Sequence, residues 1–404
     1  MRCFAFLLLL ALVPPALAQG PPPITVLHPD GATTDAHLAG LSGQTMRIFD
    51  AERRLTTLAT ATAAVLTLRD PPEDAPVPAG VLRMTDGQRL AGRWVGAADA
   101  GESLRWAHPT LGAVVVPLDR VAGWTTTAGP PLAADANGAD VVGLSSGERL
   151  TGFLYLPDAA ADSQLLMLAP ADNPDGPAVP VPAASVAAVR LANPAAAADA
   201  APARVSLHDG SRLHAFALNL GGSTAAFDAH VAGKALKVEV PSAAVRRVVF
   251  TDGGRDAHDL ADLPAQTTPP PAAADALWGP GIAGAIATPL GVRLTAPAQH
   301  IVLLPPGATH VVGRVVLDLP AGLPPERAAW AGCVLRIDGK SPVELDLSAA
   351  HAQATFRVSV PVGTTKLTFT LDPGPRGPVL DVVRIEDTLV LTATPPGGAS
   401  RSVE

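Results

Sequence analysis

Two short glycine-containing motifs have residue types and spacing that could carry chemistry. GLSSG, residues 143–147, has the G-x-S-x-G pattern in which the serine, here Ser145, is a nucleophile. That chemistry requires a strand-to-helix turn, but the following ERLTGFL alternates like a strand. GPGIAG, residues 279–284, has the dinucleotide-binding pattern, yet a Pro/Ala-rich stretch precedes it and a strand-like ATPLGVRL follows. We therefore interpret both as turns or loops and expect no catalytic residue and no cofactor.

Metal-ligating residues show no ordered spacing. The ten histidines are scattered, without an H-E-x-x-H pair, and only Cys333 lies outside the N-terminal segment. The run TDGGRDAHDLAD, residues 251–262, gathers acidic residues but lacks the alternating ligand spacing of a calcium loop. We expect no bound metal and no intramolecular disulfide, and we interpret the acidic run as a solvated linker.

Aromatic and acidic residues near the C-terminus could contact a sugar. Aromatic residues make up only 4% of the chain. Trp94, Trp106 and Trp124 fall at strand positions of one segment, where core packing is expected, whereas Trp330 lies in PPERAAWAGC, which we predict to be a loop. The carboxylates of Asp338 and Asp381 could accept hydrogen bonds from sugar hydroxyls. Asp338 also suits a hairpin turn for conformational reasons alone.

A hairpin pattern recurs four times in the first 250 residues. SLHDGSRLHAFAL, residues 206–218, alternates apolar and polar residues on either side of Asp-Gly, which takes the positive φ angles that a short hairpin demands. Related segments surround Gly31, Gly87 and Gly147, and three of the four copies close with a Val-Pro strand end, a short turn and a last strand. The recurrence predicts four small, strongly bent, all-β modules.

The module pattern V-x-L-x-D-G-x-x-L-x-G with a closing V-P-x-x-x-V resembles the Sm-like barrel, in the hairpin and the last strand only. Pro/Ala-rich runs separate the modules, so we expect extended, semi-stiff spacers with the modules strung along them.

The last part of the chain changes character. Segments such as HVVGRVVLDLP, CVLRIDGKSPVELDL and TTKLTFTLDPG predict about eight strands at regular spacing, which is typical of a β-sandwich or jelly roll. The organisation we predict is all-β, with four tandem small β-barrel-like repeats followed by a C-terminal jelly-roll or β-sandwich domain. The segments are a signal peptide at 1–18, β-repeats at 24–70, 80–127, 140–192 and 203–252 (repeats 1 to 4), a Pro/Ala-rich linker at 263–276, the sandwich at 277–392 and a disordered tail at 393–404.

The string VLRIDGKSPVELDL, followed by FRVSVPVGTTKLTFTLDPG and LDVVRIEDTLVL, resembles the NPCBM family of carbohydrate-binding modules, found beside glycoside hydrolases and in planctomycete-type secreted proteins. The resemblance rests on the Ile337–Lys340 hairpin, the strand pair from Val358 to Leu371 and Asp381 at the start of the closing strand. It implies a sandwich that binds sugar. The family carries an aromatic residue shortly after that aspartate, where this chain has Arg384. The candidate carbohydrate-binding residues are Trp330, Asp338, Asp381 and Arg384.

The N-terminal sequence and the net charge limit where the protein is located and which classes of partner it can bind. MRCFAFLLLLALVPPALA has the charged start, apolar run and small-residue cleavage site of a secretory signal. The formal charge of −8 lies along the chain with no basic stripe, which opposes nucleic-acid binding. We expect an exported protein, periplasmic, in the cell envelope or extracellular, with no membrane span.

Three hypotheses for the function remain. The first is a non-catalytic protein whose sandwich binds an envelope or extracellular carbohydrate. The second is a structural or protein-interaction scaffold of the cell envelope, with envelope proteins as partners, in which the repeats are the working surface. The third is an unrecognised hydrolase that uses Ser145.

Overall fold

The computed structural model describes residues 21–68, 80–126, 132, 135, 137–157, 165–173, 176–196, 200–251, 255–268, 284–288, 291–320, 322–374, 377 and 380–393. Within these ranges the chain is nearly all β, with one α-helix of four residues, α2 (Pro325–Ala328). The all-β prediction is confirmed: four repeats precede a C-terminal sandwich. The predicted signal peptide lies outside the described residues, as does the tail after Ala393.

Repeat 1 contains five strands and repeat 2 contains six, and in both a 3₁₀ turn precedes the last strand. In repeat 1 these elements are β1 (Pro23–Leu27), β2 (Thr33–Ser42), β3 (Thr45–Phe49), β4 (Leu55–Ala59), η1 (Thr60–Thr62) and β5 (Val65–Leu68). In repeat 2 they are β6 (Val81–Met84), β7 (Arg89–Ala91), β8 (Arg93–Ala98), η2 (Asp99–Gly101), β9 (Ser103–His108), β10 (Gly112–Pro117), η3 (Leu118–Arg120) and β11 (Val121–Thr125).

Repeats 3 and 4 follow the same order. Repeat 3 consists of β12 (Asp140–Leu144), β13 (Arg149–Tyr155), β14 (Leu165–Pro170), β15 (Val179–Pro182), η4 (Ala183–Ser185) and β16 (Val186–Arg190). Repeat 4 consists of β17 (Ala203–Leu207), β18 (Arg212–Gly221), β19 (Thr224–Val231), β20 (Lys234–Pro241), η5 (Ser242–Ala244) and β21 (Val245–Phe250). In every repeat the last strand returns to pair antiparallel with the first.

The four predicted hairpin turns are three-residue loops with one geometry. The glycines Gly31, Gly87, Gly147 and Gly210 have φ of +83°, +88°, +89° and +94°. The prediction of positive φ at both Asp and Gly is wrong, because only the glycine adopts it. The preceding Asp or Ser accepts a hydrogen bond from the backbone N–H two residues on, as Asp209 Oδ1 does from Ser211 at 2.8 Å. The Asp therefore stabilises the turn through its side chain.

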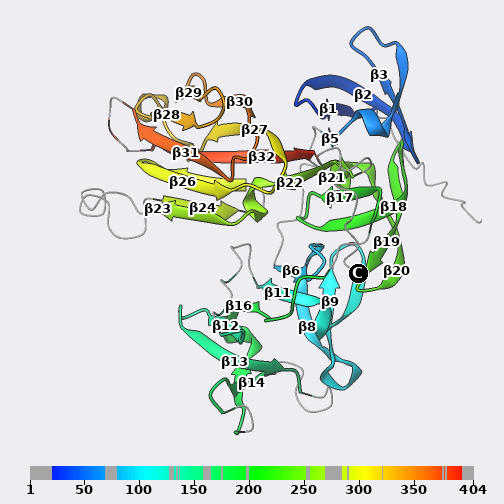
Figure 1. Ribbon diagram of the computed structural model, residues 1–404, viewed down its shortest axis with the longest axis vertical. Coiled ribbons are helices and arrows are strands. Elements are labelled where there is room, and N and C mark those ends of the chain that lie inside the picture. The colour runs from blue at the N-terminus through cyan, green and yellow to red at the C-terminus, as the bar shows by residue number, and fades with distance from the viewer. Residues whose placement is uncertain are drawn as a thin grey trace, which may run out of the picture.

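Pairs of repeats are joined through their last strands. β11 of repeat 2 pairs antiparallel with β16 of repeat 3, and β21 of repeat 4 pairs antiparallel with β5 of repeat 1. Repeat 4 also contacts repeat 2, where Arg212 of β18 pairs with Arg89 of β7. One hydrophobic core runs through all four repeats and includes the predicted core residues Trp106 and Trp124. The repeats thus pack together instead of lying apart on spacers (Figure 1).

The sandwich contains two antiparallel sheets. The first has the order β24 (Gly284–Thr288), β25 (Gly291–Thr295), β32 (Val382–Ala393), β27 (Ala308–Leu317), β30 (Gln353–Ser359), with β22 (Arg255–Asp259) also paired to β32. The second has the order β23 (Ala265–Thr268), β26 (Ala298–Leu303), β31 (Lys366–Pro373), β28 (Gly332–Ile337), β29 (Val343–Ser348). Leu260, in η6 (Leu260–Asp262), packs into the core between them.

The sandwich begins earlier than the sequence predicts. The acidic run was expected to be a linker, but its residues 255–259 form β22, in which Ala257 is buried and the five residues pair with Leu389–Ala393. Residues 265–268 of the predicted linker 263–276 form β23 against β26. Both segments are short and polar, so sequence alternation is too weak to reveal strands that pairing with a long neighbour stabilises.

The sandwich lies directly against repeats 1 and 4. A small hydrophobic cluster joins Leu27 and Val65 of repeat 1 and Val249 of repeat 4 to Val312 and Leu391 of the sandwich. The turn of repeat 1 touches the sandwich too, because Arg357 donates a hydrogen bond to the backbone oxygen of Asp30. Figure 1 shows the sandwich beside these two repeats, with repeat 3 farthest from it. The modules therefore form one connected body.

Candidate functional site

The structure brings a serine, a histidine and an aspartate together between repeats 2 and 4. His108 Nε2 lies 2.8 Å from Ser211 Oγ and 3.4 Å from the carboxylate of Asp209. All three side chains are buried. Sequence spacing carries no signal for this cluster, because His108 and Ser211 are 103 residues apart along the chain.

The hydrogen bonds of this cluster do not suit a nucleophile and its base. Nδ1 of His108 accepts backbone hydrogen bonds from Thr110 and Leu111, both at 3.0 Å, so the ring proton lies on Nε2 and is donated toward Ser211 and Asp209. A general base would need Nε2 without a proton to take one from the serine. Burial lowers the pKa of His108 more than Asp209 raises it, which keeps the ring neutral. We interpret the cluster as a polar contact that holds repeat 4 on repeat 2.

A larger charged cluster, which we call the junction, connects repeats 2 and 4 to the sandwich. Its arginines come from β6, β7, β18 and β21, and its aspartates come from β22, η6 and β32. Five arginines face three aspartates, and the members are Arg83, Arg89, Arg212, Arg246, Arg247, Asp259, Asp262 and Asp387.

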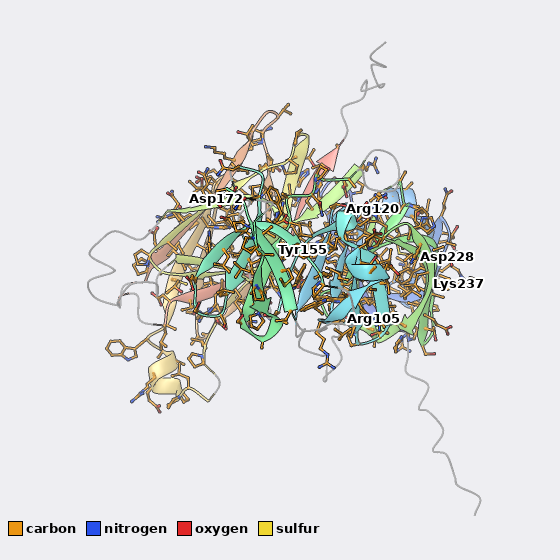
Figure 2. All side chains as sticks on the ribbon, turned by 90° about the horizontal axis from the view of Figure 1, so that it is seen from below. Arg105, Arg120, Tyr155, Asp172, Asp228 and Lys237 are labelled. Atoms are coloured by element: carbon orange, nitrogen blue, oxygen red, sulfur yellow. The ribbon has the colours of Figure 1, made fainter. Side chains whose placement is uncertain are left out.

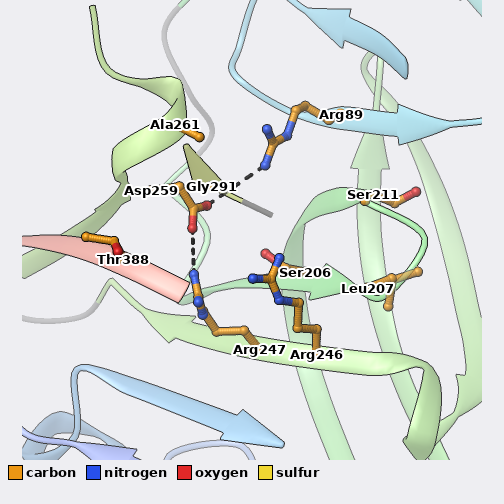
Figure 3. Close-up of a pocket in the computed structure, with 11 residues that line it drawn as sticks. Arg89, Ser206, Leu207, Ser211, Arg246, Arg247, Asp259, Ala261, Gly291 and Thr388 are labelled. Atoms are coloured by element: carbon orange, nitrogen blue, oxygen red, sulfur yellow. Dashed lines mark hydrogen bonds and ion pairs between the residues drawn. The ribbon is translucent and has the colours of Figure 1, made fainter. Parts of the chain in front are cut away.

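Asp259 is the centre of the junction. Its carboxylate lies 2.5 Å from Arg247 Nη1 and 3.9 Å from Arg89 Nη2 (Figure 3). It also contacts Arg212. The side chain of Arg247 is only 2% exposed, so this ion pair is largely shielded from water. Asp387 of β32 lies 3.1 Å from the other nitrogen of the same guanidinium. Arg247 is therefore held between two strands of the sandwich.

The pKa values in the junction follow from these contacts. Burial opposes ionisation of Asp262, but Arg212, Arg89 and Arg83 outweigh it and lower its pKa to about 2. Burial likewise opposes ionisation of Asp387, and Arg246 and Arg247 hold its pKa below the ordinary value. Both carboxylates are charged near neutral pH.

We expect the protein to lose stability on acidification in two stages. The pKa of His108, His208 and His258 is lowered, mainly by burial, so their contribution is complete above the ordinary value of 6.5 and fades as the pH falls through the folded-state values. The contribution of Asp262 is complete above its ordinary value of 3.8 and is lost as the pH falls through about 2.

Urea midpoints measured from neutral pH down to pH 2 check this expectation. The midpoint should fall below about pH 6.5 and fall more steeply below about pH 4, since protonated aspartates no longer balance the buried guanidinium groups. In Asp262→Asn the second stage should be shallower. A midpoint that stays constant over this range would contradict the assigned ion pairs.

Trp330 lies at the surface of the sandwich. Its side chain is 58% exposed and follows α2, and its backbone N–H donates to the oxygen of Arg327 at 3.0 Å. Figure 2 shows this short helix standing out from one end of the molecule. The next residue, Ala331, is buried, so the loop is anchored immediately after the tryptophan.

Asp381 anchors the loop from inside. The residue is completely buried, and its carboxylate accepts backbone hydrogen bonds from Gly332 at 2.9 Å and Gly374 at 3.0 Å. Burial raises the pKa of Asp381, and the two backbone N–H groups oppose that rise. Asp381 thus joins the start of β28 to the end of β31, and neither oxygen faces a ligand at the surface.

Asp338 lies apart from Trp330, and the side chain of Arg384 is engaged in ion pairs. Asp338 is exposed at the far end of β28, so the length of that strand, roughly 17 Å, separates it from the tryptophan loop. Arg384 lies on the outer face of its sheet, because its neighbours Val383 and Ile385 fill the core. Its side chain pairs with Asp318 at 3.1 Å and Glu386 at 2.7 Å.

The four candidate carbohydrate-binding residues therefore do not form one contact surface. Trp330 is accessible, Asp381 supports it from the interior, Arg384 belongs to a chain of ion pairs that also includes Arg314, and Asp338 stands alone in its turn. Of the four, Trp330 retains the geometry of a direct ligand contact.

Repeat 3 carries a second group of exposed aromatic residues. Phe153 and Tyr155 project from the same face of β13, with 46% and 45% of their surface exposed. Tyr155 lies opposite Met167 of β14, which lies opposite Pro180 of β15 (Tyr155 is labelled in Figure 2). This row, Phe153, Tyr155, Met167 and Pro180, is called the repeat 3 face. Its signal in the sequence was the alternation of two aromatic residues within FLY.

Of the remaining residues that sequence analysis singled out, those that the structure describes are not arranged for catalysis. Ser145 lies in the turn between β12 and β13, as predicted, where its backbone N–H donates to Ser185. The motif GPGIAG lies outside the described residues except for Gly284. Cys333 is buried, which raises the pKa of its thiol to about 12 and makes it a poor nucleophile.

The described part of the chain offers no group of three or more His, Cys, Asp or Glu side chains arranged for a metal ion. None of its helices has the length and apolar character needed to cross a bilayer.

Comparison with known proteins identifies distant structural neighbours only. No protein-family model and no curated protein sequence matches the chain. A CBM51-2 domain in complex with GlcNAc, with the INT domains, from Clostridium perfringens ZmpB, is 12% identical with a TM-score of 0.25, over 43% of this chain and 37% of that chain. Tandem CBM51 modules of a family 98 glycoside hydrolase from Streptococcus pneumoniae are 8% identical with a TM-score of 0.24, over 88% and 93%.

A CBM51 module from a Clostridium perfringens GH95 protein, in complex with methyl-galactose, is 15% identical with a TM-score of 0.20, over 25% of this chain and 68% of that chain. The chain thus matches little more than a third of the length of the ZmpB structure. These neighbours are carbohydrate-binding modules, but at such TM-scores and identities the likeness carries no argument about this chain, and its function rests on its own residues.

Proposed function

We propose that this chain is an exported, non-catalytic protein whose C-terminal sandwich binds a carbohydrate of the cell envelope or extracellular matrix. The observation that carries the proposal is Trp330, a large flat side chain that is 58% exposed on an anchored loop. The apolar face of a sugar ring packs on an aromatic ring, and the neighbouring exposed Glu326 and Arg327 offer hydrogen bonds to its hydroxyls.

The loop is preorganised, which favours binding. Asp381 fixes Gly332, two residues after the tryptophan, so little conformational entropy is lost when a ligand binds. Asp381 is in this view a positioning residue. Asp338, at the far end of β28, lies too far from the tryptophan loop to share a ligand of one or two sugar rings with it, and the side chain of Arg384 is engaged by Asp318 and Glu386.

The resemblances seen in the sequence belong to this proposal. The NPCBM interpretation is supported by the β28–β29 hairpin around Asp338-Gly339 and by Asp381 before β32. The Sm-like interpretation of the repeats is supported by the shared hairpin turn and by the last strand that closes on the first. The signal peptide predicted from residues 1–18 supports export.

We expect Trp330→Ala to lower carbohydrate affinity up to about tenfold, because loss of one aromatic stacking contact removes up to roughly 1.4 kcal/mol. Polysaccharide retention and glycan-array binding of the full chain measure the effect. Tyr155→Ala is the matched control, because it removes another exposed aromatic ring, at 45% against 58% for Trp330, from repeat 3. Affinity that is unchanged in Trp330→Ala would contradict the proposal.

The repeat 3 face supports an alternative function. It exposes two aromatic side chains on a β-sheet at the end of the molecule far from the sandwich, which is a geometry that protein interfaces use. In this alternative the chain is an envelope scaffold whose repeats bind a protein. Cross-linking in envelope preparations that is lost in Phe153→Ser and kept in Trp330→Ala, together with silence on glycan arrays, would favour it.

A further inference from the structure

The junction contains a small pocket that three parts of the chain build together. Its lining includes Arg89 of repeat 2, Ser206, Arg246 and Arg247 of repeat 4, and Asp259 of the sandwich (Figure 3). The space open to the centre of a water-sized occupant is ≈ 20 Å³. That is enough for one water molecule or an ion of similar size.

The charge around this pocket is out of balance. The five guanidinium groups of the junction face three carboxylates, so the group carries a net positive charge when every residue is ionised. Charges that are taken out of water are costly unless an opposite charge compensates them. The carboxylates of Asp259, Asp262 and Asp387 cannot compensate all five.

Two arginine side chains that line the pocket also have hydrogen-bond donors without an acceptor in the part of the chain that the structure describes. The Nε atoms of Arg89 and Arg247 are buried and have no hydrogen-bond partner among the described residues. Arg247 is 98% shielded from solvent, since only 2% of its side chain is exposed. Burial, and after it the nearby Arg246, lower the pKa of Arg247 to about 10, and an anion beside the guanidinium group would oppose that shift.

We propose that a small monovalent anion, chloride in size and charge, binds in the pocket between Arg89, Arg246 and Arg247. Charge-assisted hydrogen bonds from guanidinium N–H groups hold it, and the Ser206 hydroxyl lines the same space. The size of the pocket selects against phosphate and sulfate, whose several oxygen atoms need more room. The anion completes the contact between repeats and sandwich, and it does so independently of any carbohydrate.

Thermal unfolding of the full chain in chloride and in gluconate at equal ionic strength tests the proposal. The chloride sample should unfold at a temperature higher by about 2 °C or more, with an effect that saturates with concentration. Bromide should reproduce the saturable effect, whereas sulfate should stabilise only in proportion to its concentration, as a salt excluded from the protein surface does. Equal unfolding temperatures in chloride and gluconate would overturn the proposal, as would a sulfate effect that saturates at the same low concentration.

Variants locate the site. Arg246→Gln should abolish the difference between chloride and gluconate, whereas Arg336→Gln, an exposed arginine on the outside of the sandwich, should keep it. A chloride effect that persists in Arg246→Gln would overturn the assignment. Crystals of the wild-type chain soaked in bromide give a check that needs no variant: an anomalous peak between the three arginines supports the site, and its absence refutes it.

Discussion

Asp259→Ala should lower the free energy of unfolding by about 3 kcal/mol, because it leaves a buried arginine without its nearest partner. The carboxylate of Asp259 lies 2.5 Å from Arg247 and also contacts Arg212, and both guanidinium groups are largely shielded from water. The loss should be visible as a lower urea midpoint. Hydrogen–deuterium exchange should quicken in β21 and β22, the strands on the two sides of the junction.

The control for this prediction is Asp372→Ala. Asp372 pairs with Arg336, but both side chains are well exposed, at 39% and 51%, so the loss should stay below about 1 kcal/mol. The double variant Asp259→Leu/Arg247→Met should recover part of the stability, because apolar side chains can replace a buried ion pair. Equal losses in Asp259→Ala and Asp372→Ala would show that the junction is no more shielded than the surface.

Asp381→Ala should destabilise the sandwich by about 2–4 kcal/mol, because it leaves the N–H groups of Gly332 and Gly374 without acceptors in the interior. The same variant should weaken carbohydrate binding severalfold, although Asp381 is completely buried and touches no ligand. The reason is that the loop before Gly332, which carries Trp330, loses its anchor.

Two measurements separate these effects. Urea unfolding reports the loss of stability, and binding assays below the unfolding transition report the loss of affinity. Asp381→Asn should be milder, since its amide oxygen can still accept one of the two hydrogen bonds. Normal stability of Asp381→Ala would contradict the anchor, and normal affinity in a folded Asp381→Ala would contradict the positioning role.

Local features of the fold could be predicted from sequence because they depend on neighbouring residues. The recurring Asp-Gly or Ser-Gly pairs located all four hairpin turns, and Trp106 and Trp124 could be assigned to the core from their strand positions. The contacts between modules could not be predicted. Arg89, Arg212 and Asp259 occur in three separate modules, and nothing in their local sequence shows that they meet.

The positions of the candidate carbohydrate-binding residues could likewise be predicted only where they depend on neighbouring sequence. The exposure of Trp330 followed from its loop composition, but the burial of Asp381 depends on strands β28 and β31, which approach it from elsewhere in the chain. Arg384 could not be assigned to an ion-pair chain, since its partner Asp318 is far away in sequence. Short polar strands such as β22 are recognisable only beside the long strand that they extend.

The pairing of β5 with β21 has a consequence for how the chain folds. The two strands are separated by nearly all of the repeat region, so the first module acquires its neighbour only after the fourth has been synthesised. Contacts between residues so distant in sequence form slowly. Until then one edge of the first module stays open and can pair with another chain. Translocation that delivers the whole region before collapse would keep such premature association small.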